Sequence, residues 1–384
     1  MTCLSEPGSA TPAAPDLLTA CRRTQLVSFD LYERYETASR LVRTLRQAPA
    51  CCVLDVGGYS EPLWPGFESL VSAFLPEVDS FVVDLHREPG LKNYAAASGM
   101  ELPFLDRSFD FVMAQDALEH VAFDARPKFI QEALRVARDF VLLSFPFFTP
   151  LNEACDRLVY RYIKIRKQVE LPALKEHAEF GLPSLDHVRE WVIETGFPFR
   201  IWTHGNALVW LNMMMAKNHL WTQGIPELGQ ELDALFNVHF AARDYQEPCY
   251  RAFVLIGKER SEGEMLKDLN GLRVEPLSSA DHEGVYSLCR MITGSVSTLE
   301  AERRVQHSIN LLEGLERRVV AALEDNHQAL VDRDIRLAEA ASQAAHYKNL
   351  VDELQRKETD AQTRLAEAVS QVARYKNLVD ERSK

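Results

Sequence analysis

The stretch V-L-D-V-G-G at residues 53–58 decides the fold class of this chain. Its short apolar run stops at two glycines, which is typical of a buried parallel strand that enters a tight turn before a helix. At Gly57 and Gly58 no side chain would hold a ligand off the backbone, so main-chain N–H groups and the following helix N-terminus can face it. Asp55, just inside the end of the strand, can accept hydrogen bonds from an ammonium group or order a water.

Two later segments also end in polar residues where a strand is expected to stop. The run at residues 81–85 contains Asp84, at the position where an acidic side chain holds ribose hydroxyls in doubly wound folds, and Leu85 can then lie against a base. The run at residues 109–114 is followed by Gln115, Asp116, Glu119 and His120. Because ligands of open α/β sheets bind beyond the carboxyl ends of the strands, we expect all three segments to converge on one crevice.

The ordered set V-L-D-V-G-G, V-V-D-L, L-P-F-x-D-x-S-F-D-x-V and D-x-L-E-H-V resembles class I S-adenosylmethionine-dependent methyltransferases of type 11. The resemblance covers roughly residues 26–259. It implies an α/β, Rossmann-like methyltransferase fold, in which a mostly parallel sheet with a terminal antiparallel strand carries helices on both faces. It also implies an enzyme whose cofactor is S-adenosyl-L-methionine.

The same resemblance implies a role for individual residues. Asp55, Gly57 and Gly58 would hold the methionine end of the donor, and Asp84 would hold the ribose. Asp116 would close the site beside the sulfonium. The residues expected along the adenine are Ser98, Gly99 and Met100, next to Leu85.

Two residues depart from the family's pattern. Tyr59 stands where the turn usually has another glycine, and Ser98 stands where the adenine loop usually has an acidic residue. A glycine pair is a tolerated form of the turn, so neither departure excludes donor binding. Each site residue also has a structural interpretation, because a glycine pair can serve turn geometry alone and a strand-end aspartate can cap the next helix.

Methyl transfer from a sulfonium is an in-line displacement, so much of the catalysis can come from holding the reacting atoms collinear. A base near a hydroxyl acceptor would help, and histidine suits this role because its pKa lies near the working pH. His120 and His177 are the candidate catalytic residues. The alternative is structural: His120 and Glu119 would brace the next helix, and His177 would sit in a solvated loop at residues 175–183.

Composition narrows the class of protein. The net charge of −13 argues against nucleic acid as a partner, because counterion-driven binding needs clustered Lys and Arg. Seven cysteines without a C-x-x-C pattern suggest a reducing cytoplasm and no structural metal. The N-terminus shows no basic segment followed by an apolar core, and no run is long and apolar enough to span a bilayer. We therefore expect a cytoplasmic protein.

The chain divides into four predicted parts. These are a disordered N-terminus at residues 1–23, a methyltransferase domain at 24–259, a linker at 260–297 and a coiled coil at 298–384. Helical insertions are expected within the domain at 150–183 and 204–245. They would roof the pocket and so determine which acceptor it takes.

The C-terminal part contains an internal repeat. The segment R-L-A-E-A-A-S-Q-A-A-H-Y-K-N-L-V-D-E at residues 336–353 returns, slightly altered, 28 residues later at 364–381. Apolar residues recur in alternating steps of three and four, which indicates a coiled-coil seam and hence a homo-oligomer. A single solvated helix held by charge pairs is the alternative, because the alanines in the seam are small.

A methyltransferase domain joined to a coiled coil resembles bacterial enzymes of glycan and surface-polysaccharide assembly. By this analogy the acceptor would be a saccharide oxygen or another small molecule, although a fold does not imply a substrate. Two alternatives are a non-catalytic scaffold that uses the coiled coil for assembly, and an NAD-dependent oxidoreductase. The oxidoreductase should show G-x-G-x-x-G, which residues 57–62 do not.

Overall fold

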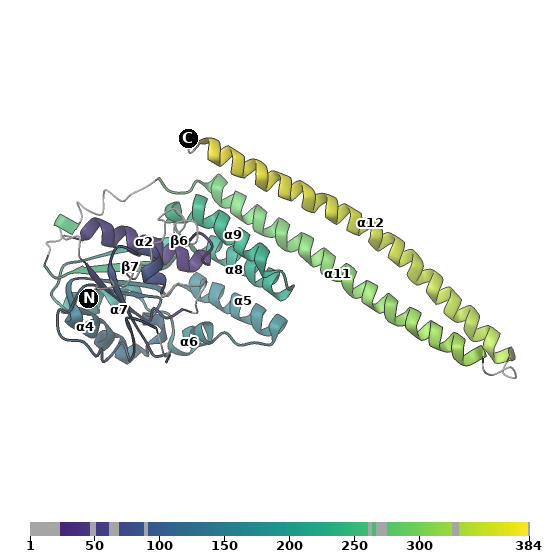
Figure 1. Ribbon diagram of the computed structural model, residues 1–384, viewed down its shortest axis with the longest axis horizontal. Coiled ribbons are helices and arrows are strands. Elements are labelled where there is room, and N and C mark those ends of the chain that lie inside the picture. Colours follow the sequence, from purple (N-terminus) through teal and green to yellow (C-terminus); the bar gives the residue numbers. More distant parts are fainter. Residues whose placement is uncertain are drawn as a thin grey trace, which may run out of the picture. The chain divides into compact units, whose positions relative to one another are not determined.

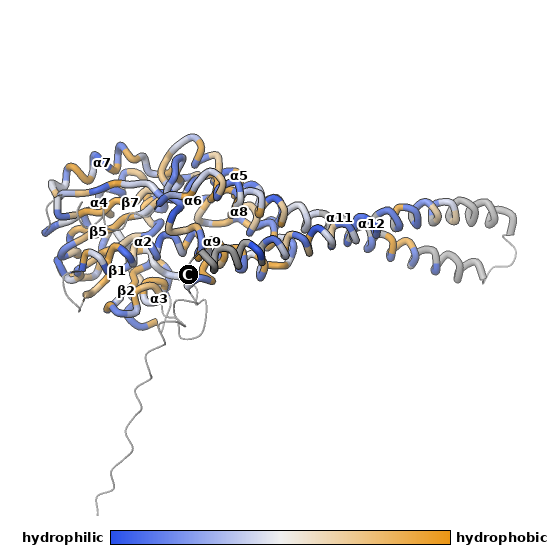
Figure 2. Tube along the Cα trace, turned by 90° about the horizontal axis from the view of Figure 1, so that it is seen from above, coloured by the Kyte–Doolittle hydropathy of each residue, from blue (hydrophilic) through white to orange (hydrophobic). Residues whose placement is uncertain are grey.

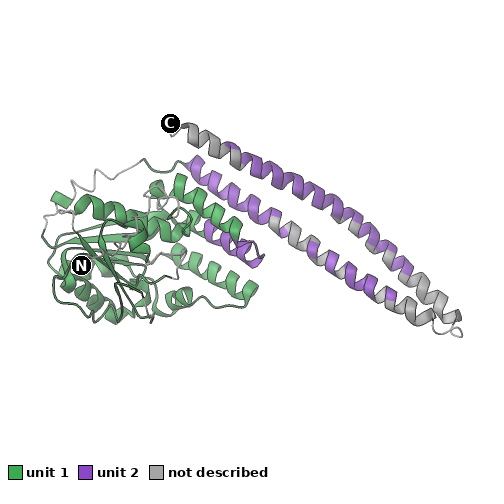
Figure 3. Cartoon of the chain, viewed as in Figure 1, with its two compact units in different colours: residues 1–211, 227–278 green, residues 212–226, 279–384 purple. Residues whose placement is uncertain are grey.

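The structure is a computed structural model, and it describes residues 24–46, 51–60, 69–87, 91–259, 263–265, 275–324 and 330–382. The predicted disordered segment 1–23 lies outside these residues. The chain forms two compact units: residues 1–211 with 227–278, and residues 212–226 with 279–384 (Figure 3).

A seven-stranded sheet with the order β3-β2-β1-β4-β5-β7-β6 forms the centre of the first unit (Figure 1). Strands β1 to β5 run parallel where they pair, whereas β7 pairs antiparallel with both β5 and β6. The predicted mostly parallel sheet with a terminal antiparallel strand is confirmed. The strands are β1 (Cys52–Val56), β2 (Asp79–Asp84), β3 (Tyr94–Ala96), β4 (Phe109–Gln115), β5 (Ala137–Pro146), β6 (Phe199–Asn206) and β7 (Cys249–Gly257).

Strand β1 shows why the sheet is covered on both faces. Val53 belongs to an apolar cluster with Leu41 and Val71, whereas its neighbour Leu54 belongs to a second cluster with Ile130. Successive strand residues point to opposite faces, so an unbroken apolar run needs helices on both sides. Figure 2 shows hydrophobic residues along the labelled strands β1, β2, β5 and β7.

Helix α2 precedes the first strand, and the other helices of this unit lie in connections between strands. The helices are α2 (Phe29–Leu45), α3 (Leu70–Phe74), α4 (Arg126–Val136), α5 (Pro150–Lys167), α6 (Pro172–Phe180), α7 (Leu185–Glu194), α8 (Ala207–Thr222) and α9 (Pro226–His239). Three short 3₁₀ segments are η1 (Leu118–His120), η2 (Phe123–Ala125) and η3 (Ala241–Arg243). The expected insertion at 150–183 contains α5 and α6, and the one expected at 204–245 contains α8, α9 and η3 after the last residues of β6.

The prediction of a loop at residues 175–183 was wrong, because most of this segment is helix α6. Pro172 stands in the first turn of α6, where its missing N–H costs nothing. Gly181, with φ of +70°, ends the helix. The charged residues between Pro172 and Gly181 are typical of a solvated loop, but here they belong to a helix, and His177 lies on that helix.

Two long helices make up most of the second unit, α11 (Ser279–Glu324) and α12 (Leu330–Arg382). They lie side by side (Figure 1). Helix α11 begins inside the predicted linker 260–297, so the predicted linker extends too far. Its first turns bury Val285 and Cys289, and the Cys289 sulfur lies 3.9 Å from the sulfur of Met213. This burial stabilises a helix in a segment that looks polar in the sequence.

Part of the predicted seam is visible in α12. Ala361 and Ala368 stand seven residues apart and are both buried. The other seam side chains that we predicted, except for half-buried Leu365, lie outside those described: Leu337, Ala340, Ala344, Tyr347, Val351, Leu354, Val372, Tyr375 and Val379. The coiled coil therefore stays a prediction. Among the described helices, none combines the length and the apolar character needed to cross a membrane.

Candidate functional site

The glycine turn after β1 is tightly packed against its surroundings. Gly57 has φ of +79° and donates its N–H to the Val83 carbonyl at 2.7 Å. A Cβ at Gly57 would lie 2.9 Å from the Cβ of Ala117, and a Cβ at Gly58 would overlap the Asp55 carboxylate. Both positions therefore require glycine. The turn lies between the carboxyl end of β2 and the segment that follows β4.

Asp55 carries a buried carboxyl group beneath this turn. Its Oδ2 accepts a hydrogen bond of 2.7 Å from the Tyr35 hydroxyl. Its Oδ1 has no hydrogen-bond donor within the described ranges. Burial raises the pKa of Asp55 to about 7, although the hydrogen bond from Tyr35 and the nearby Arg34 oppose the rise. A cationic group such as an ammonium would satisfy the remaining oxygen.

Asp84 ends strand β2 as expected. Its two carboxylate oxygens accept the backbone N–H groups of Tyr59 at 3.2 Å and His86 at 3.0 Å. Leu85 beside it is 78% exposed. The Tyr59 ring stacks on the His86 ring at 4.2 Å and meets Tyr94 edge-on. Tyrosine in place of the family's glycine is thus held by aromatic neighbours at the end of β2.

The segment expected along the adenine is ordered by contacts within the protein. The Ser98 hydroxyl accepts the N–H of Met100 at 3.2 Å. A Cβ at Gly99 would overlap the Phe129 ring of α4. This packing explains glycine at position 99 without a ligand, and the contact with adenine stays a prediction.

Asp116 lies at the carboxyl end of β4, where we expected it, but its carboxylate is engaged by arginines. Arg251 of β7 donates to both oxygens, from Nε at 2.9 Å and from Nη2 at 2.5 Å. Arg34 of α2 lies 3.3 Å away. Asp116 therefore does not present a free carboxylate to a sulfonium; it anchors the segment that leads into η1.

Sequence reasoning missed the ionic network around Asp116. Oδ1 of Asp30, in α2, accepts two hydrogen bonds of 3.0 Å, one from Nη2 of Arg251 and one from the indole N–H of Trp210. Burial alone would raise the pKa of Asp30, but Arg251 and Arg34 together hold it below its ordinary value. Two signals were available: Asp30 and Arg34 are four residues apart on one helix, and Arg251 is a lone charge in an apolar strand.

The two candidate catalytic histidines lie next to each other, with ring centroids 5.0 Å apart. His120 comes from η1 and His177 from α6. Nδ1 of His120 lies 2.7 Å from Oε2 of Glu176, and Nδ1 of His177 lies 2.7 Å from Oδ2 of Asp156. Each ring is thus oriented by a carboxylate at Nδ1, which leaves Nε2 directed elsewhere.

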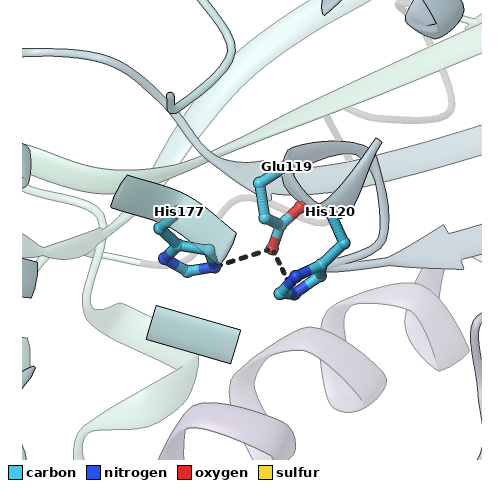
Figure 4. Close-up of side chains that lie close together, drawn as sticks. All are labelled: Glu119, His120 and His177. Atoms are coloured by element: carbon cyan, nitrogen blue, oxygen red, sulfur yellow. Dashed lines mark ion pairs between the residues drawn. The ribbon is translucent and has the colours of Figure 1, made fainter. Parts of the chain in front are cut away.

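Glu119 lies between the two rings (Figure 4). Its Oε1 is 3.9 Å from Nε2 of His120 and 3.9 Å from Nε2 of His177. The side chain is fully buried, and neither oxygen has a hydrogen-bond partner in the part of the chain that the structure describes. Burial and the neighbouring Asp116 raise the pKa of Glu119 well above its ordinary value. The sequence had suggested only a bracing role for this residue.

The structure brings most of the predicted site residues to one edge of the sheet. Contact between Gly57 and Ala117 joins the glycine turn to the segment that carries Asp116, Glu119 and His120. His177 joins them because α6 packs against η1. A separate surface hollow, lined by Arg189, Phe197 and Phe199 among others, lies near the opposite ends of the parallel strands and contains none of these residues.

Comparisons with known proteins found one family model and several similar solved structures. Residues 75–143 match a family model described as a methyltransferase domain. Similar solved structures include the YcgJ protein from Bacillus subtilis, with 16% identity, a TM-score of 0.34, and coverage of 59% of this chain and 100% of that one. Another is a putative sarcosine dimethylglycine methyltransferase from Galdieria sulphuraria, with 17% identity, a TM-score of 0.36, and coverage of 59% and 84%.

A third is phosphoethanolamine N-methyltransferase 2 from Haemonchus contortus in complex with phosphomonomethylethanolamine and S-adenosylhomocysteine. It has 14% identity, a TM-score of 0.35, and coverage of 59% of this chain and 52% of that one. No curated protein matches this chain.

Proposed function

We propose that this chain, which carries a methyltransferase domain of the class I fold, transfers a methyl group from S-adenosyl-L-methionine to an oxygen of a small acceptor. The observation that carries the proposal is the glycine turn over buried Asp55, next to strands that the methyltransferase family model covers. An adjacent glycine pair above an acidic side chain suits a ligand with a cationic end.

The residues around the turn fit this donor. Asp55 offers a buried oxygen to the ammonium group. Gly57 and Gly58 carry no side chain that would hold the methionine end off the backbone. Asp84 keeps lone pairs for the ribose hydroxyls, and exposed Leu85 is available to the adenine. Ser98, Gly99 and Met100 are retained as the proposed adenine segment.

The acceptor would bind on the side of His120 and His177. A hydroxyl acceptor passes its proton to water, and its lone pair forms the bond to the methyl carbon while the carbon–sulfur bond breaks and leaves its electron pair on sulfur. Polar groups near the acceptor oxygen assist the loss of that proton. We keep a saccharide as the proposed acceptor class, on the analogy with glycan-assembly enzymes, and place the enzyme in the cytoplasm as a homo-oligomer without a nucleic-acid partner.

Calorimetric titration tests the proposal against its two alternatives. The full chain should bind S-adenosyl-L-methionine and should not bind NAD, because the turn lacks the G-x-G-x-x-G arrangement that suits a dinucleotide. Binding of NAD alone would favour the oxidoreductase. Heat from neither ligand would favour the non-catalytic scaffold.

Donor affinity should depend on pH through Asp55. Only the ionised carboxylate can accept from the donor's ammonium group, and its pKa in the free protein is raised to about 7 by burial. The dissociation constant should therefore be about tenfold higher at pH 6 than at pH 8, since the ionised fraction falls by that factor. An Asp55→Asn variant should bind weakly and equally at both pH values. The same pH dependence in that variant would contradict the role given to Asp55.

A further inference from the structure

We propose that Glu119, His120 and His177 form a binding site for a divalent transition-metal ion. The carboxylate of Glu119 and the Nε2 atoms of both histidines face one another, and their ligand atoms lie within 4.8 Å of one another (Figure 4). The three residues come from two segments that fold together, η1 and α6. The site is distinct from the donor cradle of Asp55, Gly57 and Gly58.

The distances suit one shared ion. Nε2 of each histidine is 3.9 Å from the same oxygen of Glu119. A direct hydrogen bond is excluded, because such bonds need about 2.7–3.2 Å between donor and acceptor. Two ligands of one ion with bonds of ~2.1 Å are ~3.4 Å apart at a tetrahedral angle and at most ~4.2 Å apart, so a bound ion would draw the side chains slightly together. The observed separation is therefore too long for a hydrogen bond and within reach of a bridging cation.

The groups behind the ligands match those that support metal-bound imidazoles. A ligating histidine usually donates its second ring N–H to a carboxylate, which fixes the tautomer and turns the other nitrogen toward the metal. Glu176 takes this part for His120 and Asp156 for His177, both at 2.7 Å from Nδ1. Asp156 is held in turn by the Tyr250 hydroxyl at 2.5 Å. With Nδ1–H donated, both Nε2 lone pairs are available.

The Glu119 carboxylate is buried without a hydrogen-bond partner among the described residues. Its side chain is 0% exposed, and across the described ranges no donor reaches either carboxylate oxygen. Nε2 of His177 likewise has no hydrogen-bond partner among the described residues. A buried polar atom without a partner loses its hydrogen bonds to water and gains none in the protein, so it destabilises the folded chain. A cation at the centre would satisfy all of them together.

The donor set indicates the class of ion. Imidazole nitrogens favour Zn²⁺, Fe²⁺ and similar first-row ions, whereas Mg²⁺ and Ca²⁺ prefer oxygen ligands. Three protein ligands leave at least one coordination position open, as in catalytic rather than structural sites. We expect the open position to take the acceptor oxygen. This role of the metal rests on the proposed methyl transfer. Metal binding itself does not depend on that step.

The test uses the full chain after treatment with a chelator. Co²⁺ is titrated while its visible absorption bands are recorded, and Zn²⁺ is titrated by calorimetry. We expect one ion per chain for both metals. Glu119→Gln and His177→Ala should each weaken binding by at least about 100-fold, and Asp156→Asn by about 10- to 100-fold through the orientation of His177.

His187→Ala is the matched control, because His187 packs against Phe123 and Trp191 outside the cluster. It should bind both metals like the unaltered chain. Circular dichroism reports whether each variant folds. If His177→Ala fails to fold, the isosteric Glu119→Gln variant carries the test. Absence of binding by the unaltered chain, or equal affinity in a folded Glu119→Gln variant, would overturn the site. Titration with S-adenosyl-L-methionine in the same metal-free samples tests the proposed function independently.

Discussion

Replacing Gly58 with alanine is expected to abolish tight binding of S-adenosyl-L-methionine. The added methyl group would overlap the carboxylate of Asp55, which is buried and cannot move into solvent. Overpacking of this kind lowers the free energy of unfolding by about 1–3 kcal/mol. It also displaces the carboxylate that would hold the donor's ammonium group, and this displacement weakens binding. We expect affinity to fall by about 100-fold or more, where each tenfold step corresponds to about 1.4 kcal/mol. Isothermal titration calorimetry measures this change.

Gly229→Ala is the control for this substitution. A Cβ at Gly229 meets no atom within 4 Å among the described residues, and the residue lies within helix α9. Alanine is favoured over glycine inside a helix by up to about 1 kcal/mol, so the protein should be at least as stable and bind the donor unchanged. A folded Gly58→Ala protein with unaltered affinity would remove the donor from this turn.

Replacing Arg251 with methionine is expected to cause the largest loss of stability. Arg251 is 1% exposed and holds both Asp116 and Asp30. Without it, these two carboxylates would face each other, and Arg34 and the indole N–H of Trp210 would be their remaining side-chain partners among the described residues. Breaking a buried ion pair from one side costs about 3–5 kcal/mol, because a buried charge is left without its partner. Urea denaturation followed by tryptophan fluorescence measures the free energy of unfolding.

Arg107→Met supplies the comparison for an ion pair at the surface. Arg107 binds Glu259 at 2.7 Å, but both side chains are about half exposed. Water and salt screen such a pair, so its loss should cost less than about 1 kcal/mol. Equal effects of the two substitutions would mean that the network around Arg251 contributes no more than an exposed pair does.

Arg251 connects the buried ionic network to the segment that carries the two site residues Glu119 and His120. Arg251 comes from β7, the antiparallel strand, and reaches Asp116 at the end of parallel strand β4. It thus ties the antiparallel strand β7 to the segment that carries Glu119 and His120. Stability of the sheet edge and placement of the histidines depend on the same buried arginine.

Local pattern was enough to predict several parts of the site. Asp55 and Asp84 were placed correctly at strand ends because an apolar run that stops at an acidic residue is a local signal. Gly57 was recognised because an apolar run stops there at a glycine pair, and its positive φ in the structure suits glycine. The pairing of His120 with His177 could not be predicted in this way, since it depends on α6. The charged residues of α6 had led us to predict a loop there.

The sequence by itself determined the alternation of strands and helices, the side of the sheet that carries the polar residues, and the glycine turn, because each follows from neighbouring residues. Tertiary structure alone decided which charges meet. Asp116 finds its partner 135 residues away on β7, and His120 finds Glu176 56 residues away on α6. The physical reason is burial, because a charge removed from water needs a partner close to it in space. Separation along the sequence does not indicate which residue that partner is.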